Sequence, residues 1–288
     1  MVNTLVYLAN RKRSVLRNWK RLEFKESEIM LYRASRHLQS EKHRLHLPVK
    51  LLPFLILAFS LSSTADTKRS YTVGVESFPY YPHYQTQGDS FEGYARDILD
   101  AFAQVKGFKL VYHPMPYMRI LNLFLSNQLD LQYPDNQYWS EKQKRNHVIH
   151  YSEPAVNYTD GVHVTQENQG KPIEQLKSIG TLIGFSPVQY FPLEEKGLLE
   201  IHYSATVEGL IDQTHLGRID GVYLNTDVIK FSQKNKTKKL TFDETLPHIH
   251  SGFSLSSIQY PNMIEEFNEF LKNNQPLVNK IKKKYQLR

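Results

Sequence analysis

Aromatic side chains follow the first strand-like segment of the chain and are suited to holding a small ligand. Residues 71–75 alternate in side-chain character, and the loop SFPYYPHY that comes next contains Phe78, Tyr80 and Tyr81 beside prolines. Aromatic faces in such a loop can stack on the apolar or cationic part of a ligand. Packing in the protein core is the alternative for each ring, and the sequence leaves both open.

Charged and polar side chains follow two further segments. Arg119 opens a helical pattern, where its guanidinium could bind an anionic group through two hydrogen bonds or form a surface salt bridge. Asp135, Asn136 and Trp139 come directly after the strand-like residues 129–133. Because these side chains donate or accept hydrogen bonds, the sequence predicts contacts to a polar ligand here.

A serine followed by a proline stands after the strand-like residues 181–185. The hydroxyl of Ser186 could cap free backbone amides, and Pro187 could take the first helical position, where no N–H is needed. The pair predicts a helix start, and such starts bind anions. A cap without a ligand is the alternative.

Strands separated by helices must position these side chains. Apolar residues at helical spacing predict one helix within residues 91–107 and another within residues 117–128, with strand-like segments on both sides. This alternation predicts a parallel sheet, whose ligands usually bind outside the carboxyl ends of the strands. The expected carboxyl ends of these strands are residues 76–84, 113–119 and 133–139. The sequence shows no internal repeat.

The order of these motifs resembles the family 3 extracellular solute-binding proteins, periplasmic receptors that feed ABC importers of polar amino acids. The resemblance covers nearly all of the chain after residue 70. It implies a two-lobed α/β periplasmic-binding-protein fold of type II, in which each lobe is a mixed or parallel sheet flanked by helices and two strands form a hinge. The matching residues are Phe91, Gly93, Asp97 and Ile98, then residues 117–121, 129–131 and 151–154.

The resemblance also implies a division of the chain. We expect residues 66–160 and 253–288 to form lobe 1 and residues 161–252 to form lobe 2, with a leader in residues 1–65. Crossing strands near residues 155–165 and 246–256 would form the hinge, and closure of such a hinge over a ligand is the expected motion.

Further ligand contacts are implied by the resemblance. Counting back from Tyr151, Arg145 falls where such receptors place the arginine that pairs with the α-carboxylate of the ligand, and Tyr117 lies in a matching motif. Asn225 ends an alternating strand where they place an acidic residue for the α-ammonium group.

This chain departs from the usual pattern of those receptors in both lobes. After the third strand it has Asp135, Asn136 and Trp139 in place of small hydroxylic residues, and Asn225 is neutral. An amide in place of a carboxylate gives up a charge-assisted hydrogen bond. The ligand could therefore be an amino acid or a polar or anionic molecule without the amino acid head group.

The expected function is that of a monomeric receptor that closes around a small polar solute and delivers it to an inner-membrane ABC permease. No catalytic residue, cofactor or metal is expected. Two alternatives stay open: a sensor input domain without a transporter, and a dehydratase-like enzyme in which Asp135 or Glu76 acts as a general acid. His248 and His250 could face one side of a strand as metal ligands, but no third ligand is apparent.

Charge is spread unevenly along the 288 residues, whose formal net charge is +7. Residues 1–65 contain 12 Lys or Arg and 4 acidic residues, which leaves 24 and 25 of the totals of 36 and 29 for residues 66–288. The body of the protein is nearly neutral, so nucleic acid is not an expected partner. Cysteine is absent, which excludes disulfides and thiolate metal sites.

The leader has the composition of an export signal. A lysine precedes the apolar residues 51–61, and Ser63 to Ala65 fit a small-residue cleavage site, so we expect cleavage before Asp66 and a periplasmic location. An uncleaved anchor is the alternative. Because the basic segment before it is unusually long, we also expect that translation starts downstream, at Met30 or Val49.

Overall fold

The computed structural model describes residues 69–88 and 90–287, so the leader and its expected cleavage site lie outside the described residues. Among the helices of this described part, none is long and apolar enough to cross a membrane. The description below concerns the compact unit Asp66–Arg288 alone.

The first lobe begins with a βαβαβ unit. β1 lies between β4 and β5 and is parallel to both. α3 buries Ile98, Leu99 and Phe102 against the sheet, and Gly107 ends it with a φ of 79°, a conformation that favours glycine. The predicted pattern of strands and helices is confirmed here. The elements are β1 (Ser70–Glu76), β2 (Gln85–Gln87), β3 (Ser90–Glu92), α3 (Tyr94–Lys106), β4 (Lys109–Met115), α4 (Tyr117–Leu125), β5 (Leu131–Asp135), α5 (Glu141–Lys144) and β6 (His150–Tyr151).

The second lobe repeats this topology. β8 lies between β9 and β10 and is parallel to both, with α6 and α7 in the connections. α7 buries Val207, Leu210 and Ile211 and is capped by the Thr206 hydroxyl, which accepts a hydrogen bond from the Gly209 N–H. The elements are η2 (Ile173–Gln175), β8 (Ser178–Leu182), α6 (Phe191–Glu195), β9 (Glu200–Ser204), α7 (Val207–His215), β10 (Gly221–Asn225), α8 (Thr226–Ser232) and β11 (Thr241–Phe242).

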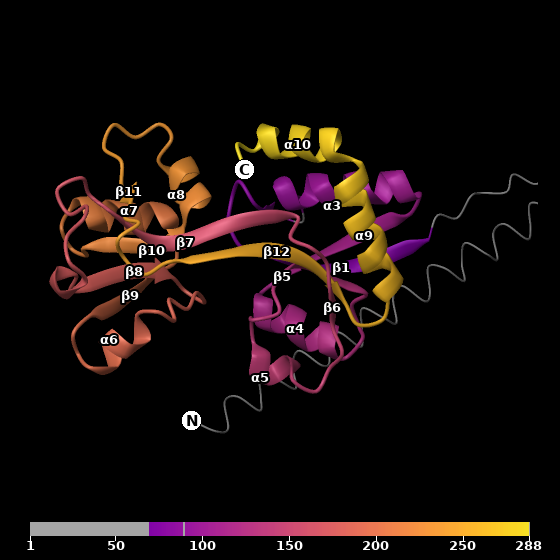
Figure 1. Cartoon of the computed structure of the whole chain (residues 1–288), viewed down its shortest axis with the longest axis horizontal. Coiled ribbons are helices and arrows are strands. Elements are labelled where there is room, and N and C mark those ends of the chain that lie inside the picture. The colour runs from indigo at the N-terminus through magenta and orange to yellow at the C-terminus, as the bar shows by residue number, and fades with distance from the viewer. Residues whose placement is uncertain (1–68, 89, 288) are drawn as a thin grey trace, which may run out of the picture. The chain divides into compact units, whose positions relative to one another are not determined.

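Two long antiparallel strands, β7 (Val156–Val164) and β12 (Ile249–Ser257), join the lobes. β12 continues from its pairing with β7 into a pairing with β5, and β7 pairs with β10. Figure 1 shows these two strands running side by side from the β8–β10 region to the region of α3 and α4. α9 (Pro261–Asn273) then contacts β12, and α10 (Gln275–Lys284) contacts α3. The fold is the expected two-lobed α/β fold with a two-strand hinge.

The same anchor precedes the third strand of each lobe. In the first lobe, Asp130 Oδ2 accepts hydrogen bonds from the N–H and the hydroxyl of Thr72, both at 2.7 Å. In the second lobe, Asp220 Oδ2 accepts bonds from the N–H groups of Lys177 (2.7 Å) and Ser178 (2.9 Å). In both, the aspartate N–H donates back to the hydroxyl of the first strand. The two lobes are therefore built by the same local device.

The helix start predicted at Ser186 is wrong. Residues 183–190 form turns, and α6 begins only at Phe191. Ser186 is exposed. The turn is held by the buried ring of Tyr190, whose hydroxyl donates to the Pro247 carbonyl at 2.8 Å. Because this tertiary contact fixes Tyr190 as the residue before the helix, the local capping preference of the Ser-Pro pair is overridden.

Candidate functional site

The carboxyl ends of the strands of both lobes meet at a cluster of aromatic and polar side chains, which we call the inter-lobe cluster. Rings of the first lobe contact Phe185 of the second: the centroid distance is 5.8 Å from Phe78 and 5.2 Å from Tyr80. His83 Nε2 lies 3.2 Å from Asn225 Oδ1 in a buried hydrogen bond. The members of the cluster are Glu76, Phe78, Tyr80, His83, Tyr84, Tyr158, Asp160, Phe185 and Asn225.

Two carboxylates of this cluster, Glu76 and Asp160, form no ion pair with another described residue. Burial raises the pKa of Glu76 to about 7, against a hydrogen bond from the Tyr84 hydroxyl at 2.8 Å that lowers it, and the charge of Asp135 adds to the rise. Burial likewise raises the pKa of Asp160 to about 7, and the neighbouring Asn225 amide offsets part of the rise. In the described part of the chain, Asp160 Oδ1 has no hydrogen-bond partner of normal geometry.

A neutral histidine stands opposite Asn225. Burial lowers the pKa of His83 to about 4, so its ring is uncharged at neutral pH. Since Asn225 Oδ1 is an acceptor, His83 Nε2 carries the proton and donates, which leaves Nδ1 as an acceptor without a partner among the described residues. Asn225 Nδ2 also lacks a partner there. The cluster therefore contains unused donors and acceptors from both lobes.

Asp135, predicted to contact the ligand, is held inside the first lobe. Its carboxylate accepts hydrogen bonds from Lys144 Nζ (2.6 Å), the Ser256 hydroxyl (2.6 Å) and the Asn136 N–H (2.7 Å). Burial raises its pKa, and Lys144 acts against this rise. The buried cation near this strand end is Lys144, whereas Arg145, in the expected position for a carboxylate-binding arginine, is exposed. On this short helix the residue before Arg145 points inward.

Asn136 and Trp139 support the hinge in this structure. The Asn136 side chain donates to the Ser251 hydroxyl at 2.8 Å and to the Gly252 carbonyl at 3.0 Å, which ties the end of β5 to β12. The Trp139 ring packs edge-on between the rings of Tyr117 and Phe253. These contacts place the three predicted residues Asn136, Trp139 and Tyr117 beside the crossing strands.

An open groove of about 1130 Å³ runs along the hinge strands and adjoins the inter-lobe cluster. Asn136, Tyr138, Thr159 and His250 line it. Tyr158 and Asp227 line it as well, and Asp227 Oδ2 also lies 3.6 Å from His83 Nε2. Tyr158 is thus shared by the groove and the inter-lobe cluster.

Of the predicted site residues, Phe78, Tyr80 and Asn225 come together in the inter-lobe cluster. Tyr81 instead packs on Phe231 and Tyr285, at centroid distances of 4.3 and 5.9 Å. The two arginines, Arg119 and Arg145, are exposed, as is Ser186.

Several members of the inter-lobe cluster were not among the predicted ligand contacts, namely Glu76, His83, Tyr84, Tyr158, Asp160 and Phe185, and neither was the nearby Lys144. Glu76 entered the sequence analysis only as an alternative general acid. Asp160 offered a usable signal, because it is an ionisable residue inside an alternating strand that was expected to be half buried. Lys144 offered none, since it lies in a run of charged residues typical of a solvated surface.

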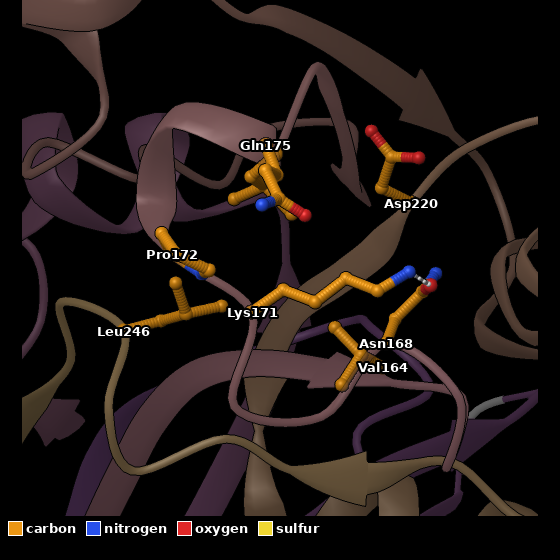
Figure 2. A pocket seen from close by; sticks show the side chains of 8 residues that line it. Val164, Asn168, Lys171, Pro172, Gln175, Asp220 and Leu246 are labelled. Carbon is orange, nitrogen blue, oxygen red and sulfur yellow. Dashed lines mark hydrogen bonds between the residues drawn. The ribbon is translucent and has the colours of Figure 1, made fainter.

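A separate pocket of about 90 Å³ lies in the second lobe beside η2 (Figure 2). Lys171 Nζ donates to Asn168 Oδ1 at 2.6 Å there, and Asp220 points away from that pair. Since Asp220 already anchors β8, the pocket offers a ligand few free polar groups.

The two histidines considered as metal ligands lie with ring centroids 4.9 Å apart. His248 Nδ1 contacts the Leu246 carbonyl oxygen at 2.9 Å, and His250 Nδ1 contacts the Thr159 hydroxyl at 2.8 Å. Within residues 69–88 and 90–287, no group of three or more His, Cys, Asp or Glu side chains is arranged to hold a metal ion.

Solved structures with the same fold are amino acid-binding proteins. A periplasmic binding protein of an arginine transport system from Legionella pneumophila is 14% identical with a TM-score of 0.59, covering 76% of this chain and 100% of its own. An ancestral arginine-binding protein bound to arginine is 18% identical with a TM-score of 0.58, covering 76% and 99%. An ancestral amino acid-binding protein, a precursor of cyclohexadienyl dehydratase, is 16% identical with a TM-score of 0.56, covering 75% and 95%. At these identities the likeness shows the fold alone.

A protein family matches the sequence itself over most of its length. The matched region is residues 71–287, which contains both lobes, the hinge and the inter-lobe cluster. No curated protein sequence matches the chain. The chain belongs to the bacterial extracellular solute-binding proteins, family 3.

Proposed function

We propose that this protein is a receptor that closes around a small polar solute and delivers it to an ABC importer. The observation that carries the proposal is the inter-lobe cluster. Its members lie at or after the ends of β1, β8 and β10 or within β7, and among the described strands β7 and β12 are those that join the two lobes, so a change at the hinge would open or close the cluster. Free donors and acceptors at such a place suit binding of a polar solute.

The ligand contacts proposed are Phe78, Tyr80 and Asn225 together with Glu76, His83 and Asp160. Tyr117, Asp135, Asn136 and Trp139 would act by shaping the strand ends and the hinge. Arg119, Arg145, Tyr81 and Ser186 stay as predicted contacts, to be tested by substitution. The lobe boundaries proposed are residues 66–160 with 253–288, and 161–252.

Binding without chemistry is part of this proposal. Of the two carboxylates considered as general acids, Asp135 is engaged by Lys144 and Ser256. Glu76 keeps the dehydratase-like alternative open, because burial raises its pKa to about 7. The protein would act as a monomer in the periplasm, where family members meet their permeases. A neighbouring permease and ATPase gene pair would support import, and a neighbouring sensor kinase gene would support signalling instead.

A thermal-shift screen of the purified protein tests the proposal. The panel contains amino acids, amines, carboxylates, sugars and short peptides. A ligand that binds only the folded state at 100 times its Kd adds about 2.7 kcal/mol to the free energy of unfolding, which raises Tm measurably. Solution scattering with the best compound should show compaction. If no compound raises Tm or changes the scattering curve, the receptor proposal fails.

A further inference from the structure

The charges buried at the strand ends do not suit a ligand that carries a carboxylate. The cation that could pair with such a group is Lys144, and its Nζ is already bound to Asp135 Oδ1 at 2.6 Å and to the Asn136 carbonyl at 2.9 Å. Lys144 is only 5% exposed, and its charge is neutralised by Asp135 inside the lobe. The two predicted alternatives, Arg119 and Arg145, are exposed.

The remaining charge in the cluster is negative. Glu76 and Asp160 form no ion pair with any described Lys, Arg or His, as the ion pairs found within residues 69–88 and 90–287 involve other carboxylates. Burying a carboxylate without a cationic partner is costly, and its pKa rises as a result. A positively charged group placed between the lobes would offset that cost.

The surroundings of these carboxylates suit an organic cation rather than a metal ion. The ring of Tyr80 packs on those of Tyr84 and Phe185 at centroid distances of 5.3 and 5.2 Å, and the Tyr84 hydroxyl donates to Glu76. Burial raises the pKa of Tyr80, and the charges of Asp160 and Glu76 add to the rise. Aromatic faces attract organic cations. Fully buried Asn225 is paired with Asp160 across β10 and β7, and its Nδ2 has no hydrogen-bond partner of normal geometry among the described residues, so it could turn to one neutral acceptor on the ligand.

We propose that the solute is a small organic cation, an amine or guanidinium compound without a free carboxylate, bound between Glu76 and Asp160 against the rings of Tyr80 and Phe185. This inference rests on the proposed receptor function and names its ligand class. It replaces the amino acid or anionic ligand that the sequence alone left open. Asp135 supplies within the protein the carboxylate that an amino acid ligand would otherwise bring to Lys144.

Calorimetric titration with matched pairs of compounds tests this assignment. The pairs are agmatine with arginine and cadaverine with lysine, which differ in the α-carboxylate. We expect the amine of at least one pair to bind about tenfold or more tightly than its amino acid, because no free buried cation receives the carboxylate. Equal or tighter binding of both amino acids would overturn the ligand class and leave the receptor function standing. No binding by either member of either pair would also overturn it, and the broader screen would then decide the receptor function separately.

Variants locate the cation. Glu76→Gln and Asp160→Asn should each weaken amine binding about tenfold or more, because each removes a charge-assisted hydrogen bond. Glu265→Gln, an exposed carboxylate on α9, is the matched control and should leave it unchanged. Unchanged affinity in both cluster variants would overturn the proposal.

A gain of function gives an independent test that does not depend on losing affinity. Asp135→Asn frees the Lys144 ammonium, so it should shift the preference between agmatine and arginine about tenfold toward arginine. If the variant folds and keeps the wild-type preference, Lys144 is not what excludes the carboxylate and the proposal fails. If it does not fold, Asp135→Ser, which also removes the carboxylate that holds Lys144 Nζ, is the second variant and should shift the preference in the same direction.

Discussion

The third parallel strand of each lobe, β5 or β10, ends on a polar residue in an equivalent place. The two residues form different hydrogen bonds. β5 ends on Asp135 and β10 on Asn225, each five residues after an anchoring aspartate (135 − 130 and 225 − 220). The first lobe neutralises its charged strand end from within, through Lys144.

The second lobe uses its strand end differently. Asn225 Oδ1 accepts hydrogen bonds from the N–H groups of Asp227 (2.9 Å) and Val228 (3.3 Å), which caps α8, and the same oxygen meets His83 of the first lobe. The same topology thus gives two different strand ends. The end of β5 has its partners within its own lobe, and the end of β10 contacts the other lobe. Under the proposed function, recognition would therefore fall to β1, β7 and β10, while the end of β5 would serve as a structural element.

The largest expected effect comes from removing the cationic partner of Asp135 at the end of β5. Lys144→Met leaves Asp135 buried without its partner, which should lower the free energy of unfolding by about 3–5 kcal/mol. Urea denaturation measures it. The matched control is Lys236→Met, which removes the exposed partner of Asp212 and should cost less than about 1 kcal/mol. Similar losses in both variants would show that the Asp135 pair is no more important than a surface pair.

The pH dependence of the unfolding free energy distinguishes the buried Glu76 of the inter-lobe cluster from the other titratable groups of the protein. Its pKa is raised on folding from 4.5 to about 7, so the folded state binds more protons between these values and wild type loses stability as pH rises through that window. Glu76→Gln does not titrate there. The difference in unfolding free energy between the two proteins should therefore change by up to roughly 3 kcal/mol between pH 4 and 8.

The use of a difference matters here, because His83 and His163 have pKa values lowered to about 4 and oppose the trend in wild type as pH falls below 6.5. Both histidines are present in the variant and cancel. Parallel stability curves for wild type and Glu76→Gln would mean that Glu76 is paired or solvated in solution.

The shared anchors should respond alike. Asp130→Ala leaves the N–H and hydroxyl of Thr72 without their acceptor, and Asp220→Ala does the same to the N–H groups of Lys177 and Ser178. Each change should cost about 1–3 kcal/mol in unfolding free energy. Urea denaturation of both variants checks whether the two costs agree. A cost confined to one lobe would show that the geometric repeat is not an energetic one.

The smallest expected effect is at the end of β10. Asn225→Ala removes the cap of α8 and should cost about 1–2 kcal/mol, near the cost of Thr206→Ala at the cap of α7. Ligand affinity distinguishes the two: the first variant should bind weakly and the second like wild type. If both keep full affinity, Asn225 is only a cap.

The structural elements of the first lobe could be predicted from the sequence because their signals are local. Ile98, Leu99 and Phe102 recur at helical spacing, and Gly107 supplies the left-handed end of the same helix. The prediction at Ser186 failed where a local signal competed with a distant one, the contact of Tyr190 with Pro247. The sequence gives no clear signal for the anchor that both lobes repeat, Asp130 with Thr72 and Asp220 with Ser178. Thr72 and Ser178 have only a hydroxyl group in common.

The sequence alone determined the family and the order of strands and helices in the first lobe, since periodicity and turn residues act over a few positions. Only the tertiary structure decided which charges remain free. Lys144 lies nine residues from Asp135 and faces it, while Arg145 beside it faces solvent. Glu76 on β1 and Asp160 on β7 are both buried, although 84 positions (160 − 76) separate them in the sequence. Such pairings depend on which side chains share a desolvated space, and distance along the chain does not encode that.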